Sequence, residues 1–168
     1  PLTFPKSLDQ LPAFDDYSMV GRTYRYMTEI PLYPFGFGLG YSQFAYEGLK
    51  LQRAELAKGE SLDLCLVVRN VGDQTAAEVV QFYISDLAAS TIVPLSHLIG
   101  FERVELQPGG HQEIQFTITP DMMSFFNDEG TLTLEPGQFR LEIGGCSPGK
   151  RGQDLGAPKP ASAIFTIK

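Results

Sequence analysis

The sequence contains many carboxylates, and a facing pair of carboxylates is the arrangement that cleaves a glycosidic bond across roughly 5 to 9.5 Å. Two local groups are candidates, namely Asp15 with Asp16, and Asp128 and Glu129 with Glu135. Adjacent residues on an extended chain point apart. The second group lies at turns, where acids beside Gly or Pro are expected for backbone reasons alone. We therefore interpret both groups as structural and expect no catalytic residue in this chain.

Other catalytic and metal-binding patterns are also missing from the sequence. No Gly-rich phosphate loop, calcium-binding loop or Cys/His zinc cluster has the required spacing. His97 and His111 are isolated near the ends of expected strands, and we assign them local or solvent-exposed roles. Cys65 lies on the outer face of an expected strand, where a bridge to Cys146 between two sheets is not expected. The sequence therefore predicts no cofactor, no metal and no disulfide.

The composition is that of a globular protein with one ordinary domain and an appendage. The chain has 168 residues, of which 43% are hydrophobic. Its formal charge is -7 and its 13 basic residues are scattered, which argues against nucleic acid or an anionic membrane as partner. No apolar run approaches the roughly 18 residues that cross a bilayer. The chain begins with Pro1 rather than Met, so we expect a piece of a longer or processed protein, with periplasmic, secreted and cytoplasmic locations all open.

From residue 41 onward, short alternating runs of apolar and polar residues follow one another at the spacing of β-strands. The clear runs are 44–51 with an irregularity near Gly48, 61–69, 77–84, 98–106, 111–119, 138–143 and 163–167. Residues 121–128 fit one helical turn or a bulged edge, and residues 147–160, rich in Gly and Pro, predict an exposed loop. With no amphipathic helix, the pattern predicts an all-β fold, a seven-stranded immunoglobulin-like β-sandwich over residues 41–168.

Residues 1–40 have a different character and predict a long extended strap. They contain five prolines and no sustained period of 2 or 3.6. Their aromatic residues are Phe4, Phe14, Tyr17, Tyr24, Tyr26, Tyr33, Phe35 and Phe37. A free linker would instead be polar or rich in Gly and Ser. We therefore expect an ordered strap whose rings pack on a surface.

Three local features of the strap follow from its sequence. Residues 22–26 fit a short extended segment with both tyrosines on one face. The adjacent acids that precede this segment lie close enough in sequence to pair with Arg22 or Arg25. Residues 31–41 alternate bulky side chains with glycine and cannot form a compact core alone. Their rings must be buried against the domain that follows or against a partner outside this sequence.

Several motifs carry a resemblance to a known family. The sequences GRTYRY at 21–26 and PLYPFGFGL at 31–39 are similar to the junction near the C-terminus of family 3 glycoside hydrolases, the β-glucosidases and β-xylosidases. Further motifs resemble the fibronectin type III-like domain that ends many of these enzymes, at 70–73, 78–83, 100–104, 106–109 and 135–137. The resemblance covers nearly the whole chain.

This resemblance implies that residues 1–40 are the strap leaving a preceding α/β sandwich domain, and that residues 41–168 are the appended β-sandwich. In this family the nucleophile is an Asp in a Ser-Asp-Trp context on the N-terminal barrel, and the acid/base Glu usually belongs to the α/β domain. This chain has no Trp and neither domain, so no catalytic residue carries over. The chain alone is expected to be non-catalytic, and its parent to be a retaining β-glucosidase or β-xylosidase that hydrolyses O-glycosidic bonds through two carboxylates.

The expected role of the chain is to brace the catalytic domains of the parent through the strap. The residues expected at this domain interface are Tyr17, Arg22, Tyr24, Tyr26, Tyr33, Phe35 and Phe37. Arg and Tyr are common anchors at such contacts. The alternative is a carbohydrate-binding module with a β-glycan as partner, because a β-sandwich can present aromatic rings to sugars. An independent adhesion domain is a third interpretation.

Overall fold

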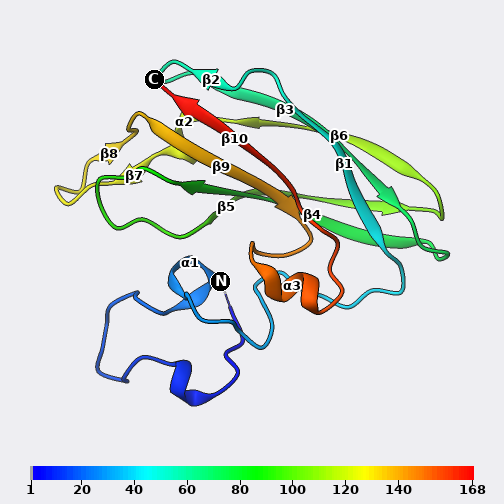
Figure 1. Cartoon of the computed structure of the whole chain (residues 1–168), viewed down its shortest axis with the longest axis horizontal. Helices are drawn as coiled ribbons and strands as arrows, with labels where there is room; N and C mark the ends of the chain where they lie inside the picture. The colour runs from blue at the N-terminus through cyan, green and yellow to red at the C-terminus, as the bar shows by residue number, and fades with distance from the viewer. Residues whose placement is uncertain (1) are drawn as a thin grey trace.

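The computed structural model of the protein describes residues 2–168 and shows a β-sandwich with the strap packed against it (Figure 1). The long strands are β1 (Phe44–Leu51), β3 (Leu62–Asn70), β4 (Ala76–Asp86), β5 (His97–Leu106), β6 (His111–Ile118), β9 (Gly137–Gly144) and β10 (Ala161–Ile167). The short elements are η1 (Leu8–Gln10), α1 (Thr23–Tyr26), β2 (Glu55–Leu56), α2 (Pro120–Met123), β7 (Phe125–Phe126), β8 (Leu132–Thr133) and α3 (Lys150–Asp154). No helix within residues 2–168 has the length and apolar character to cross a bilayer.

The long strands form two sheets that face each other (Figure 1). One sheet has the order β1-β3-β6, and the other has the order β2-β10-β9-β4-β5. Neighbouring strands are antiparallel, except that β2 runs parallel to β10. The strands β7 and β8 make a separate small hairpin. The predicted all-β sandwich is confirmed, and the sheet order leaves β5 as an edge strand beside β4.

The alternation in each long strand places one apolar row between the sheets. In β3 the buried row is Leu62, Leu64, Leu66 and Val68. Cys65 lies on the opposite face of this strand, as predicted, and both cysteines are free thiols. Across the core Phe82 stacks on Phe116 with 4.2 Å between ring centroids. Each fully buried side chain of this size contributes about 1.5–3 kcal/mol to the free energy of folding, so these rows hold the two sheets together.

The turn after β3 is held by a buried amide, the side chain of Asn70. Its Nδ2 atom donates to the carbonyls of Gln74 (2.7 Å) and Leu106 (2.9 Å). Its Oδ1 atom accepts from the hydroxyl of Ser42 (2.6 Å) and from the amide of Gly72 (3.0 Å). Because all of these polar atoms are paired, the hydrogen bonds offset the cost of removing the fully buried amide from water. This turn motif is therefore structural.

Strand β4 is buried differently along its length. From Ala76 to Val79 exposure alternates, whereas from Val80 to Ser85 every residue is buried. Alternate side chains of a strand point to opposite faces, so the second half of β4 is covered on both faces. The core covers one face, and the strap covers the other.

Three local expectations have definite outcomes. The irregularity near Gly48 is confirmed by a register shift between Glu47 and Lys50, and the expected helical turn is α2. Residues 22–26 are not extended but form the helical turn α1, which buries Tyr24 and includes Thr23 at a φ of 56°. Such a φ strains a β-branched residue, so packing of the tyrosine outweighs local preference here. The expected exposed loop 147–160 contains α3, and its Ser147 and Gly152 are buried.

Replacement of Gly100 by Ala tests the ring stack in the core. A Cβ atom at this position would lie 2.5 Å from Cε2 of Phe116, which is already stacked on Phe82. We expect Gly100→Ala to lower the free energy of unfolding by about 1–3 kcal/mol, measured by urea denaturation. Gly38→Ala is the control, because a Cβ atom there meets no atom within 4 Å. Equal stability of the two variants would contradict this packing.

Candidate functional site

The candidate site is the contact between the strap (residues 2–40) and the outer face of the sandwich. The strap, which includes α1, lies on the side of the larger sheet and near the segment that carries α3 (Figure 1). Three parts of the domain receive it: the second half of β4, the start of β5 with the residues just before it, and the segment that follows β9. Because the strap has almost no regular structure of its own, side chains and isolated backbone bonds must fix its position.

The ring of Tyr24 is the centre of this contact. It is only 9% exposed, stacks on Phe35 with centroids 4.8 Å apart, and meets the edge of Tyr83 at 5.6 Å. Its hydroxyl accepts a hydrogen bond from the backbone amide of Leu98 (3.1 Å). A buried tyrosine needs such a partner for its hydroxyl, and the strap thereby satisfies a donor of the edge strand β5.

The side chain of Gln81 is the polar counterpart of this ring cluster. Its Oε1 atom accepts a hydrogen bond from the hydroxyl of Tyr83 (2.6 Å). Its Nε2 atom donates to the carbonyl of Gly145 (2.7 Å) and to that of Gly36 in the strap (3.3 Å). Burial raises the pKa of Tyr83 well above its ordinary value, so this hydroxyl remains a donor at every physiological pH. One amide thus joins β4, the strap and the segment after β9.

Backbone bonds extend the contact in both directions. The amide of Ser147 donates to the carbonyl of Phe35 (2.8 Å), and Nε of Arg151 donates to the carbonyl of Leu32 (3.1 Å). At the other end, the amide of Leu95 donates to the carbonyl of Arg25 (2.7 Å). Each bond alone contributes about 1 kcal/mol, so the strap is held by their sum and by the buried rings.

The seven residues predicted for a domain interface are not all available for one. Tyr24 and Phe35 pack on the sandwich, whereas Tyr17 is 91% exposed. Arg22 donates from its guanidinium to the carbonyls of Ser18 (2.9 Å) and Asp16. The other three are partly exposed, and they are Tyr26, Tyr33 and Phe37. The structure therefore separates the set into rings that hold the strap on the sandwich and rings that remain open.

The carboxylates considered for catalysis tie loops together. Glu135 accepts from the amide and the hydroxyl of Ser90 (3.0 and 2.7 Å), which lowers the pKa of its carboxyl. Asp128 accepts from the hydroxyl of Thr91 (3.1 Å). Both acids thus fasten the loop after β4 to the segment 128–135. Glu135 also lies near Asp86, whose carboxyl has its pKa raised first by burial and further by this second charge.

The first acidic pair likewise shapes the strap. Asp16 accepts from the backbone amide of Ser18 (2.8 Å), and this bond, more than the nearby Arg22, lowers the pKa of its carboxyl. The expected ion pair with an arginine is not among the salt bridges of residues 2–168; the guanidinium of Arg22 instead donates to the backbone carbonyl of Asp16. Within residues 2–168, no group of three His, Cys, Asp or Glu side chains is arranged to hold a metal.

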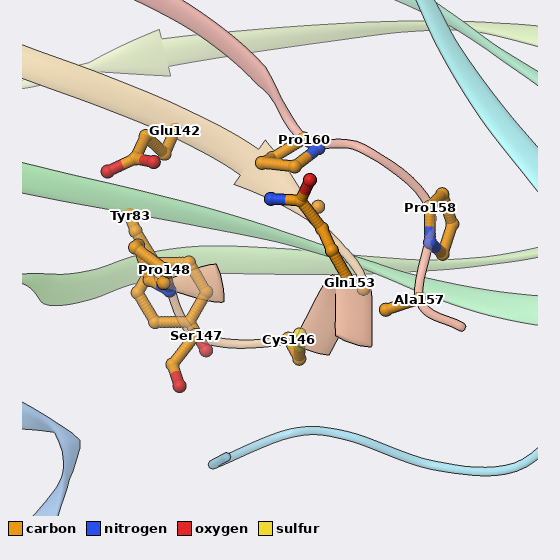
Figure 2. A pocket seen from close by; sticks show the side chains of 12 residues that line it. Tyr83, Glu142, Cys146, Ser147, Pro148, Gln153, Ala157, Pro158 and Pro160 are labelled. Atoms are coloured by element: carbon orange, nitrogen blue, oxygen red, sulfur yellow. The ribbon is translucent and has the colours of Figure 1, made fainter. Parts of the chain in front are cut away.

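A small cavity lies under the segment that follows β9, with Tyr83, Glu142, Cys146 and Gln153 around it (Figure 2). Burial raises the pKa of the carboxyl of Glu142, and it raises that of the Cys146 thiol to about 11. The thiol is therefore protonated and unreactive at neutral pH. The cavity holds about 10 Å³, room for one water and not for a sugar ring.

Comparison with known proteins places this arrangement in a family. Residues 78–147 match the fibronectin type III-like domain. A putative β-xylosidase of Formosa agariphila is 38% identical over 151 residues, covering 88% of this chain and 20% of that protein. A periplasmic β-glucosidase of Salmonella typhimurium is 33% identical over 156 residues, covering 86% of this chain and 20% of that protein.

Solved structures give the same result for the fold. The GH3 β-glucosidase of Bifidobacterium adolescentis superposes with a TM-score of 0.80 at 26% identity, covering 98% of this chain and 25% of that one. The β-glucosidase of Listeria innocua in complex with glucose gives 0.78 at 29% identity, covering 98% and 23%. Residues 78–147 are thus a fibronectin type III-like domain, and the chain around them is similar to the corresponding part of a family 3 glycoside hydrolase. The resemblance in the strap and strand motifs is thereby confirmed.

The chain spans about a fifth of the length of the curated relatives it matches. Those relatives therefore contain other domains besides the matched part. The matches extend over the strap as well as the sandwich, since they cover 86–88% of the chain in sequence and 98% in structure.

Sequence reasoning missed the residues of the domain that receive the strap. Gln81, Tyr83 and Ser85 share the outer face of β4 and are all buried there. The sequence does contain a signal for them: the alternation in β4 assigns Gln81 and Tyr83 to a solvent-facing side, where a large aromatic ring beside an amide is unexpected. Such a pair on an outer face indicates a covering segment.

Replacement of Gln81 by Leu tests the polar joint. The variant leaves the hydroxyl of Tyr83 and the carbonyls of Gly36 and Gly145 without their partner. We expect a loss of about 2 kcal/mol or more in the free energy of unfolding, together with faster tryptic cleavage after Arg25. Gln115→Leu, on the exposed outer face of β6, is the control. Unchanged protection of the strap would show that Gln81 does not hold it.

Proposed function

We propose that this chain is the non-catalytic, C-terminal domain of a retaining β-glucosidase or β-xylosidase, and that it braces the catalytic domains of that enzyme. Residues 1–40 connect it to a preceding α/β domain, and residues 41–168 are the appended sandwich. The parent hydrolyses O-glycosidic bonds with two carboxylates supplied by its other domains. The observation that carries this proposal is the match of almost the whole chain to a fifth of enzymes named β-xylosidase and β-glucosidase.

The strap supports the bracing role because several of its large apolar side chains remain exposed after it has packed on the sandwich. Phe14 is 99% exposed and Tyr17 is 91% exposed, and Leu8 and Val20 are also largely open. A monomeric surface rarely leaves such rings together without a partner. We assign this outward side of the strap to the interface with the catalytic domains, together with the partly exposed Tyr33 and Phe37 nearer the sandwich.

A carbohydrate-binding module is less well supported. Sugar-binding rings need a common platform. The exposed rings of residues 41–168 lie on different elements, with Phe101 on β5, Phe126 on β7 and Tyr41 just before β1. Calorimetric titration of the chain with β-glucan and xylan tests this alternative directly. Saturable heat of binding would favour the module, and its absence is expected under the bracing role.

Truncation of Tyr17 tests the bracing role in the parent enzyme. If this ring is buried by the catalytic domains, Tyr17→Ala should weaken their contact by about 2 kcal/mol and shorten the half-life of glycosidase activity at elevated temperature. In the 168-residue chain alone the same change should leave stability unchanged within about 0.5 kcal/mol, because the ring is already exposed.

Phe126→Ala is the matched control, since this exposed ring lies on the hairpin of β7 and β8. It should leave the half-life of the parent unchanged. A parent whose half-life is the same with and without the ring of Tyr17 would contradict the bracing role assigned to the strap.

A further inference from the structure

A groove with five glycines in its lining opens where the strap enters the first strand. Its walls are residues 36–40, the start of β1, residues 77–79 of β4 and the loop 155–158, and it encloses about 470 Å³. It continues into a second hollow bounded by residues 40–43 and 71–73. The walls lack bulky side chains at Gly36, Gly38, Gly40, Gly145 and Gly156. An extended chain can therefore lie close to the backbone there.

One carboxylate lies in this groove, that of Glu78. Glu78 lies two residues before Val80 in β4, so its side chain points to the same inward face of the strand. It is half-buried at the open end of the sandwich. Its Oε1 atom accepts a hydrogen bond from the amide of Val79 (2.9 Å), and within residues 2–168 it forms no salt bridge. Burial raises the pKa of this carboxyl, as expected where a charge lacks compensation.

The groups around Glu78 do not supply the missing charge. The ionisable side chains that face it are Tyr46 from β1 and Cys146 from the segment after β9. The hydroxyl of Tyr46 is buried and has no hydrogen-bond partner among the described residues. Both groups are neutral at physiological pH, because burial raises their pKa values. A half-buried acid therefore remains beside an unused hydroxyl.

The rim of the groove is apolar. Leu39 is 91% exposed and Tyr41 is 95% exposed, and Val71 and Val79 are partly open on the opposite side. Along both hollows the charged lining residues are Glu78 and Asp73, with no Lys, Arg or His among them. The groove thus combines apolar edges with negative charge only. Its charge disfavours a second copy of this chain, whose net charge is -7, and favours a cationic segment.

We propose that the groove receives an extended segment of the parent polypeptide whose Lys or Arg side chain pairs with Glu78, while Leu39 and Tyr41 close over its apolar neighbours. This inference rests on the bracing role and places a second contact away from the outward rings of the strap. Leu39 and Tyr41 were not among the residues predicted for the interface.

Hydrogen exchange in the intact parent tests the groove. Amides of residues 36–43 should exchange more slowly in the parent than in the 168-residue chain, because the bound segment covers them. In the parent, Glu78→Gln should raise their exchange rates about tenfold or more, the effect of losing one charged pair. Glu113→Gln, an exposed acid on β6, is the control and should change nothing there.

In the isolated chain, where no segment fills the groove, Glu78→Gln is expected to raise stability instead of lowering protection. Since the pKa of Glu78 is raised in the folded state, the folded chain holds more protons than the unfolded chain just above pH 4.5, and its stability falls as pH rises through that window. Glu78→Gln removes this loss. The 168-residue variant should therefore gain in melting temperature over the wild type on going from pH 4 to pH 7.

Exchange at residues 36–43 tests the groove, and exchange at residues 8–20 tests the bracing role, so the two proposals can fail independently. Unchanged exchange at residues 36–43 in the Glu78→Gln parent would overturn the groove, even if residues 8–20 remain protected. Equal exchange of residues 8–20 in the parent and in the isolated chain would overturn the bracing role itself. A Glu78→Gln chain that is less stable than the wild type at pH 7 would show that this acid already has a partner inside the domain.

Discussion

The stack of Tyr24 between Phe35 and Tyr83 is the contact on which the rest of this structure depends. A strap with almost no regular structure has no internal source of order, so its conformational entropy must be overcome by a few specific contacts. The ring stack removes apolar surface from water, and Gln81 pairs the polar atoms that this burial would otherwise leave unsatisfied. Together they fix the largely irregular residues 2–40 as a defined surface.

The same contact explains the division of labour along the strap. The rings of Tyr24 and Phe35 face β4 and hold the strap on the sandwich, although sequence reasoning assigned both to an interface with other domains. Rings that face away, such as Tyr17, are left for another body. The tight α1 turn makes this division possible, because it turns Tyr24 inward at the cost of strain at Thr23.

The sandwich could be predicted from the sequence, and the details of the site could not. The alternation of apolar and polar residues in β3 and β6 predicts these strands directly, because one face of each is buried in the core and the other faces solvent. The burial of Tyr83 depends on a segment almost sixty residues away; the local pattern indicates that some segment covers this face but not which one. Glu78 likewise stands at an inward position of β4, yet only the folded chain shows that no basic residue reaches it. Contacts between residues far apart in the sequence, rather than local propensity, decide both the burial of Tyr83 and the surroundings of Glu78.

The bonds from the strap to β5 have a consequence for how the domain is delimited. The amide of Leu98 belongs to the start of the edge strand β5 and that of Leu95 lies just before this strand, and the strap accepts a hydrogen bond from each. A protein cut at residue 41 would keep all of its long strands and still present an uncapped border with free backbone donors and a bare tyrosine on β4. Such borders recruit strands from neighbouring molecules. The smallest piece that stays monodisperse is therefore larger than the sandwich, and it begins within the strap, before α1.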